Sequence, residues 1–155
     1  FLGGGMIKGI SLVGKGIAKV PGVETALSVT KSLFSTATKN KEFDAVIFSG
    51  VIQYLKNYEK SIMEINRILK SNGKLILATV NRESLFRKLG IIKKEPKKEA
   101  GEHRIFSKRE IKDLLERYGF QIKKVKGADF ITMPKDLSSN LLFVALKAKK
   151  SSEET

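Results

Sequence analysis

Residues 42–81 read EFDAVIFSGVIQYLKNYEKSIMEINRILKSNGKLILATVN, and this stretch decides the fold. It holds two nearly continuous apolar runs, FDAVIFS at 43–49 and KLILATV at 74–80. Such runs are typical of strands that are buried on both faces of a parallel sheet, where no polar face is needed. The sequence therefore predicts two buried strands within forty residues of each other.

A helix is predicted between these two strands. Asn57 can cap its start, and the isoleucines that follow fall on one stripe as far as about Lys70. Asn72-Gly73 is a signal that stops a helix. Alternation of strand, helix and strand indicates an α/β fold with a parallel sheet.

The C-terminal part predicts a second helix and two further strands. Ser107 and Glu110 form a capping box, S-x-x-E, at the start of a helix that Gly119 ends. Residues 120–125 and 141–148 are the predicted strands, and this closing pair can add an antiparallel strand at one edge. The predicted fold is a Rossmann-like α/β fold, with a mostly parallel sheet, helices on both faces and an antiparallel edge strand.

The N-terminal part is less regular. Residues 6–12 and 23–29 predict strands, and residues 13–20, interrupted by two glycines, predict a short helix or a loop. Residues 32–41 are polar and predict a loop. We expect a single domain over residues 1–149 and a polar tail over residues 150–155.

Composition excludes several kinds of site. The chain has no cysteine, which rules out disulfides, thiolate metal ligands and a cysteine nucleophile. Its single histidine, His103, rules out a multi-histidine metal site, so no metal is predicted. No apolar run approaches the roughly 18 residues of a membrane-spanning helix, and no signal-peptide pattern is present. We therefore expect a cytoplasmic protein.

The chain is strongly basic. Lys and Arg number 30 against 16 acidic residues, for a net charge of +14. Such a field attracts polyanions, whether nucleic acid, anionic lipid or a phosphorylated substrate. A lysine-rich surface without any specific partner explains the same excess, so charge alone does not choose between these alternatives.

Part of this charge lies in residues 82–98, RESLFRKLGIIKKEPKK, which hold seven basic and two acidic residues. A loop is predicted here, with one helical turn at 83–89. Apolar residues among the charges make a short amphipathic patch, which suits a lid, a contact to an anionic substrate or a contact to a membrane surface. The alternative is a solvated loop that packs its own few apolar side chains.

Residues 42–126 resemble the class I S-adenosylmethionine-dependent methyltransferases, in the group that includes ubiquinone-biosynthesis-type enzymes. Phe43-Asp44, the helix end EINRILK at 64–70, and HRIFSKREIKDLLERYGFQI at 103–122 carry the resemblance, in the family's order and spacing. The resemblance implies a Rossmann-like fold, S-adenosylmethionine as cofactor, and methyl transfer to a small-molecule or lipid-like acceptor.

The resemblance also implies a site beyond the carboxyl ends of the strands, where ligands of open α/β sheets bind. Gly50, directly after the first buried strand, lets the backbone approach a ligand closely. The implied cofactor contacts are Gly3, Gly5, Ser11, Ser49, Gly50 and Gln53, and the implied acceptor contacts are Tyr54, Asn81 and His103.

Some of these residues have a second interpretation. Gln53 and Tyr54 can simply cap the next helix and cover the core. His103 is a weak candidate for a general base on the acceptor, but a lone histidine before a helix cap is more often structural. No catalytic residue is assigned beyond it, because methyl transfer depends mainly on positioning.

The N-terminus departs from the family pattern, and we expect the domain to be N-terminally incomplete relative to it. In the family the first strand ends in an acid and a glycine-rich loop, of which FLGGG at 1–5 can be the tail. An acid usually ends the second strand, but Ser11 stands there and brings no charge. The chain is either a piece or variant of an active enzyme, or a degenerate, non-catalytic homologue that binds nucleic acid or a protein through its basic surface. Whether this chain alone is an enzyme stays open.

Overall fold

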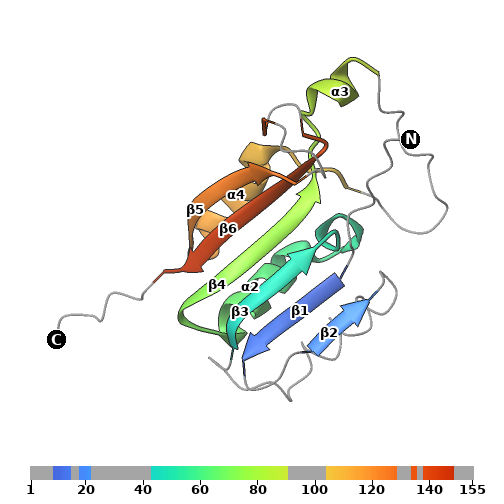
Figure 1. The fold of residues 1–155 in the computed structure, drawn as a ribbon. Coiled ribbons are helices and arrows are strands. Elements are labelled where there is room, and N and C mark those ends of the chain that lie inside the picture. The colour runs from blue at the N-terminus through green and yellow to red at the C-terminus, as the bar shows by residue number, and fades with distance from the viewer. Residues whose placement is uncertain are drawn as a thin grey trace.

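The computed structural model describes residues 9–14, 18–21, 43–90, 104–128, 134–135 and 138–148. These residues contain six strands in one sheet, in the order β2-β1-β3-β4-β6-β5 (Figure 1). The strands are β1 Gly9–Gly14, β2 Ala18–Pro21, β3 Phe43–Ser49, β4 Leu69–Val80, β5 Phe120–Gly127 and β6 Asn140–Lys147. The helices are η1 (a 3-10 turn) Ile52–Tyr54, α2 Tyr58–Ile68, α3 Leu85–Lys88 and α4 Lys108–Arg117.

The centre of the sheet is the predicted unit. β3 and β4 run parallel, with α2 between them in sequence, as the two apolar runs and the helical stripe predict. β6 lies antiparallel between β4 and β5. The Rossmann-like α/β class is confirmed, and the sheet is mixed.

The sheet is less parallel than the sequence predicts. Among the described strands, β3 and β4 form the one parallel pair, because β1 runs antiparallel to both β2 and β3. An apolar run does not encode a strand's direction. Only residues 15–17 separate β1 from β2, and so short a connection can join only antiparallel neighbours.

The prediction of a helix or loop over residues 13–20 is wrong in part, because Ala18–Pro21 form a strand. Pro21 ends the outer strand of the described sheet, and edge strands are where sheets accept proline. The predicted strand at 23–29, the loop at 32–41 and the polar tail at 150–155 lie outside the described residues. The single domain over 1–149 stays a prediction.

The core lies between the sheet and two helices. α2 and α4 both pack against the same face of the sheet, and Figure 1 shows them together behind the strands. Both helices turn an apolar stripe toward the same alternate set of strand residues, so the two long helices of the described residues share one face although helices on both faces were predicted. The buried set includes Phe48, Ile62, Ile65, Ile68, Leu75, Leu77, Ile111, Leu114, Leu115, Leu141 and Phe143.

The opposite face carries a row of aliphatic side chains. Ile47 pairs with Ile76, and Ile76 pairs with Val144, across three neighbouring strands. All three side chains are of intermediate exposure. Their alternation with the buried residues of the same strands is the two-residue period of a pleated sheet.

The two long helices begin differently from one another. The capping box of α4 is confirmed, since Ser107 Oγ accepts from Glu110 N and Glu110 Oε2 accepts from Ser107 N. Asn57 is the N-cap residue of α2, but its side chain makes no capping hydrogen bond. Asn57 therefore occupies the predicted N-cap position, but it does not form the side-chain hydrogen bond of a cap.

α2 ends slightly earlier than predicted, at Ile68, and β4 follows at once from Leu69. The Nζ of Lys147 donates to the carbonyls of Asn66 and Leu69, which the end of a helix leaves without intrahelical partners. Asn72 has a φ of +62°, so the predicted stop signal is a left-handed turn inside β4. The register between β3 and β4 shifts at this turn.

Candidate functional site

The predicted site begins where β3 and β4 end side by side, because Ser49 pairs with Ala78. The chain turns sharply after Ser49 at Gly50, which has a φ of +62°. The Gly50 N–H donates to the carbonyl of Ala78 across 2.8 Å. A side chain at this position would strain the backbone. Glycine adopts this conformation without that strain.

Gln53 follows in η1 and is 2% exposed. Its side-chain oxygen accepts a hydrogen bond from the Thr79 hydroxyl across 3.4 Å. The Gln53 carbonyl accepts from the Arg104 N–H across 3.0 Å. Gln53 thus joins three segments at the carboxyl edge, and Tyr54 beside it is partly buried.

Asn81 follows the strand that carries Thr79 and is 3% exposed. Its side-chain amide donates to the Ser138 carbonyl across 2.9 Å, and its side-chain oxygen accepts from the Glu83 N–H across 3.0 Å. The side chain holds two backbone segments together at the end of the sheet. This structural use accounts for its burial without any ligand.

Ser11 lies inside β1, opposite Ile47, whereas Gly9 is the residue of β1 that pairs with Ser49 at the carboxyl edge. The sequence placed Ser11 at the carboxyl end of a strand, next to the ligand. Because β1 is antiparallel to β3, its amino end reaches this edge instead. The predicted contacts Gly3, Gly5 and His103 lie outside the described residues.

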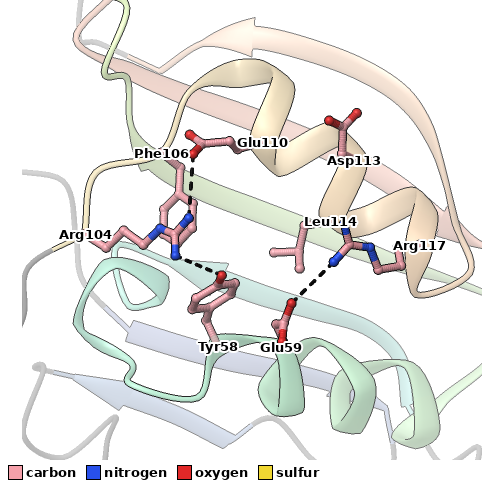
Figure 2. Close-up of a pocket in the computed structure, with 8 residues that line it drawn as sticks. All are labelled: Tyr58, Glu59, Arg104, Phe106, Glu110, Asp113, Leu114 and Arg117. Atoms are coloured by element: carbon pink, nitrogen blue, oxygen red, sulfur yellow. Dashed lines mark hydrogen bonds and ion pairs between the residues drawn. The ribbon is translucent and has the colours of Figure 1, made fainter.

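A cavity of about 250 Å³ lies elsewhere, between α2 and α4 (Figure 2). Tyr58 and Phe106 meet edge to face there, with ring centres 5.2 Å apart. At the other end of the cavity, Arg117 pairs with Glu59 across 3.5 Å. None of its lining residues is a predicted site residue: Tyr58, Glu59, Arg104, Phe106, Glu110, Asp113, Leu114 and Arg117. The described residues among the predicted cofactor contacts include Ser49, Gly50 and Gln53 at the carboxyl edge, and we place the candidate site there.

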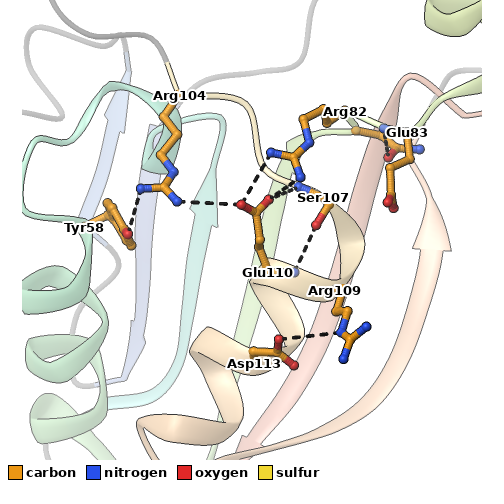
Figure 3. A network of polar contacts seen from close by, with 9 residues as sticks. Tyr58, Arg82, Glu83, Arg104, Ser107, Arg109, Glu110 and Asp113 are labelled. Atoms are coloured by element: carbon orange, nitrogen blue, oxygen red, sulfur yellow. Dashed lines mark hydrogen bonds and ion pairs between the residues drawn. The ribbon is translucent and has the colours of Figure 1, made fainter.

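The carboxyl edge and the cavity share a polar network centred on Glu110 (Figure 3). The Arg82 guanidinium pairs with Glu110 Oε2 at 3.1 Å and Arg104 pairs with Glu110 Oε1 at 3.6 Å. The hydrogen bond from the Ser107 backbone holds the pKa of the Glu110 carboxyl below its usual value. The Ser107 hydroxyl and the two arginines lower this pKa further, while partial burial opposes them.

Arg104 links this network to η1 through its backbone N–H, which donates to Gln53, and to α2 through its side chain. Its guanidinium lies 5.1 Å from the ring centres of both Tyr58 and Phe106, a placement in which an aromatic ring attracts a cation. It also donates to the Tyr58 hydroxyl across 3.0 Å. Sequence reasoning missed Arg104, although it stands in the HRIFS segment that carries the family resemblance.

Metal-binding clusters and membrane spans are both lacking in the described part of the chain. It contains no cluster of three or more His, Cys, Asp or Glu that could hold a metal ion. No helix within it is long and apolar enough to cross a membrane.

Residues 6–125 match the protein family described as "Methyltransferase domain". This chain belongs to that family. The match takes in the carboxyl edge of β3 and β4, the Glu110 network and the whole of α4. The resemblance to class I S-adenosylmethionine-dependent methyltransferases is thereby confirmed, and S-adenosylmethionine is the cofactor that goes with this membership.

The methyltransferase domain is similar to curated enzymes over part of their length. It is 31% identical over 116 residues to the ubiquinone biosynthesis O-methyltransferase of Rickettsia canadensis, covering 71% of this chain and 48% of that protein. It is 33% identical over 103 residues to the mitochondrial enzyme of the same name from Rattus norvegicus, covering 62% and 30%. The chain spans no more than about half the length of these relatives.

Solved structures agree on the fold. A methyltransferase from Thermotoga maritima, titled a possible histamine N-methyltransferase, superposes with a TM-score of 0.59 at 25% identity, covering 74% of this chain and 61% of that one. A methyltransferase from Bacillus halodurans gives a TM-score of 0.58 at 16% identity over 76% and 75%. The methyltransferase domain therefore has the architecture of this family as well as its sequence pattern.

Proposed function

We propose that this domain takes part in methyl transfer from S-adenosylmethionine to a small-molecule or lipid-like acceptor. The family match over residues 6–125 carries the proposal. The names of the Rickettsia and rat relatives, ubiquinone biosynthesis O-methyltransferases, support an acceptor that is small or lipid-like. Because the chain covers less than half of each relative, the proposal extends to a class of acceptor and not to one compound.

The described residues fit one side of a cofactor site. Gly50 lies at the carboxyl edge with a positive φ, and because glycine has no Cβ, its backbone permits close approach by a ligand. Ser49 is half-buried beside it, and the buried amide of Gln53 is held by Thr79. These features support the proposal that Ser49, Gly50 and Gln53 contact the cofactor.

The remaining predicted contacts keep their roles as proposals: Gly3, Gly5 and Ser11 for the cofactor, and Tyr54, Asn81 and His103 for the acceptor. When bound, S-adenosylmethionine supplies a methyl group on a sulfonium that is already a good leaving group. The residues of this chain therefore need to position the acceptor more than to activate it. Of the acceptor group, Asn81 has the weakest claim, because its amide is already engaged.

Residues 82–98 are proposed to meet an anionic partner, either a charged group of the acceptor or a membrane surface. The described part of this segment includes α3. Leu85 begins the helix and is 41% exposed, and Leu89 caps its end and is 63% exposed. Arg87 and Lys88 lie between them in sequence, so the helix combines exposed apolar side chains with basic residues, as such contacts require. The cytoplasmic location stays a prediction.

Calorimetric titration of this chain with S-adenosylmethionine and S-adenosylhomocysteine tests the proposal. We expect binding of both in the micromolar range, with S-adenosylhomocysteine displaced by the methyl donor. If a sample with cooperative thermal unfolding shows no heat of binding for either, this chain does not hold the cofactor by itself, and the proposal is wrong for it.

The alternative, a non-catalytic basic module for nucleic acid or a protein partner, draws on the net charge of +14. Its signature is binding to nucleic acid that weakens steeply as salt rises. A gel-shift series with an unrelated duplex, run beside the calorimetry, separates the two. Nucleic-acid binding without cofactor binding would favour the alternative.

A further inference from the structure

Glu110 pairs with an arginine at each end of the connection between β4 and α4. The chain leaves β4 after Val80, and Arg82 and Arg104 lie at the two ends of the connection that leads to α4 and includes α3. Both guanidinium groups point to the Glu110 carboxylate (Figure 3). Arg82 uses two nitrogens, Nη2 at 3.1 Å from Oε2 and Nη1 at 3.4 Å from Oε1. Such a fork gives both geometric definition and a charge-assisted bond.

The returning segment rests directly on the proposed cofactor turn. The Arg104 N–H donates to the Gln53 carbonyl across 3.0 Å, and Phe106 forms a parallel bridge with Asn81. The Arg82 N–H donates to the Phe106 carbonyl across 3.1 Å. The position of this segment and the position of η1 are therefore coupled through backbone hydrogen bonds.

We propose that Glu110 is a positioning residue for the cofactor turn, acting through Arg104. Its carboxylate fixes the Arg104 side chain between Tyr58 and Phe106, and the backbone of Arg104 in turn fixes Gln53 and the rest of η1. The significance for binding rests on the proposed function. The mechanical link from Glu110 to η1 is independent of it.

Glu110 affects the position of η1 through its charge and not through its capping of α4. The capping bond from Ser107 to Glu110 acts within the first turn of α4, and a glutamine at this position can make the same bond. The ion pairs with Arg82 and Arg104 need a negative charge. Replacement by glutamine therefore separates the two roles.

The ring contacts of Arg104 make this link stronger than an ordinary surface ion pair. Exposed pairs contribute little, because two long side chains must be ordered to form them. Arg104 is already ordered by two ring contacts and by its bond to the Tyr58 hydroxyl. The Glu110 carboxylate is likewise held by Ser107, so little further ordering is needed when the two meet.

Two readouts on one set of variants test the proposal. Glu110→Gln and Arg104→Gln are expected to raise the dissociation constant for S-adenosylhomocysteine about fivefold, the lower end of typical couplings between linked sites. Arg104→Lys is expected to recover only part of the loss, since lysine lacks the fork. The backbone N–H groups at position 104 and at Tyr54 donate to the carbonyls of Gln53 and Val51, and their hydrogen exchange is expected to be faster in both glutamine variants.

Arg109→Gln is the matched control. It also removes the cation of an ion pair within α4, because Arg109 lies 4.0 Å from Asp113, but the Arg109 side chain is 90% exposed. It should change neither readout. Ser107→Ala removes the side-chain cap and keeps the charge of Glu110, so it should leave the affinity and the exchange of Arg104 and Tyr54 close to those of the parent.

The outcomes separate this proposal from the proposed function. If the parent chain binds the cofactor and Glu110→Gln binds it equally well with unchanged exchange, the positioning role is overturned and the function stands. If the parent chain does not bind the cofactor, the proposed function is wrong for this chain, and amide hydrogen exchange alone tests the positioning role of Glu110. Faster exchange at Arg104 and Tyr54 in Glu110→Gln, but not in Arg109→Gln, then supports the link, and equal exchange overturns it.

Discussion

Thr79 donates its hydroxyl to the side-chain oxygen of Gln53 across 3.4 Å, and the two residues are only 1% and 2% exposed. Together with the bond from the Gly50 N–H to the Ala78 carbonyl, this contact ties the end of β4 to the segment that follows β3. The carboxyl edge of the parallel pair is thus closed by one backbone bond and one side-chain bond. Both lie beside the proposed cofactor contacts.

Thr79→Val should destabilise the domain by about 1 kcal/mol, because it keeps the shape of the side chain but leaves the Gln53 oxygen buried without its donor. Urea unfolding followed by circular dichroism measures the loss. Thr79→Ser, which keeps the hydroxyl, is the control and should recover most of this bond. A valine variant as stable as the parent would mean that the contact contributes nothing.

Gly50→Ala should lower stability by roughly 1–2 kcal/mol through the strain of a positive φ, and should also weaken cofactor binding. Gly90→Ala is the matched control, since Gly90 has a φ of +71° and open space around its Cβ position. The control should lose comparable stability but keep its affinity for S-adenosylhomocysteine. Equal affinity in the two variants would remove Gly50 from the cofactor side.

Asn81→Ala should cost about 1–3 kcal/mol, since the Ser138 carbonyl loses its donor in a buried place and the part-buried Glu83 N–H loses its acceptor. Asn57→Ala makes a useful comparison, because the Asn57 side chain forms no capping bond, and it should change the unfolding free energy much less. Thermal unfolding of both variants in parallel is sufficient. The idea fails if the two substitutions prove equally mild.

The contribution of Glu110 should depend on pH in a defined direction. Its folded pKa is lowered from 4.5, first by the Ser107 backbone bond. A carboxyl with a depressed pKa stabilises the folded state above its unfolded pKa, and this stability is lost as the pH falls through the folded pKa. The difference in unfolding free energy between parent and Glu110→Gln should therefore be full near neutral pH and vanish well below pH 4.5.

Denaturant unfolding of the two proteins at a series of pH values checks this expectation. Arg109→Gln again serves as the control, with a difference from the parent that should stay small throughout. A gap between parent and Glu110→Gln that widened on acidification would contradict the expected direction.

The central part of the fold was predictable because its signals are local. The apolar runs of β3 and β4 and the capping box of α4 each lie within a few consecutive residues, and all three are present, although β4 begins at Leu69, before its apolar run. The turn at Gly50 was also accessible, because glycine after a buried strand is a local mark. Similarity to a known family extended this interpretation to the cofactor.

Other features depend on contacts between residues that are distant in sequence. Gln53 and Thr79 are 26 residues apart, and Arg82 and Glu110 are 28 apart, so no local pattern joins them. The direction of β1 was missed for a related reason, since hydrophobic pattern fixes which face is buried but not which way a strand runs. Ser11 consequently pairs with Ile47, and Gly9 is the residue of β1 that pairs with Ser49.

The position of β6 has a consequence for how the chain is made. This last described strand lies between β4 and β5 in the sheet, so β5 has no hydrogen-bonded neighbour in the described sheet until β6 arrives. Synthesis proceeds from the N-terminus, so β5 is made before the strand with which it pairs, and the edge of β4 is unpaired until β6 follows. A ribosome that stalls before residue 140 would hold a nascent chain in which β4 and β5 share no strand ladder, and both would stay open to chaperones and proteases until β6 closes the seam.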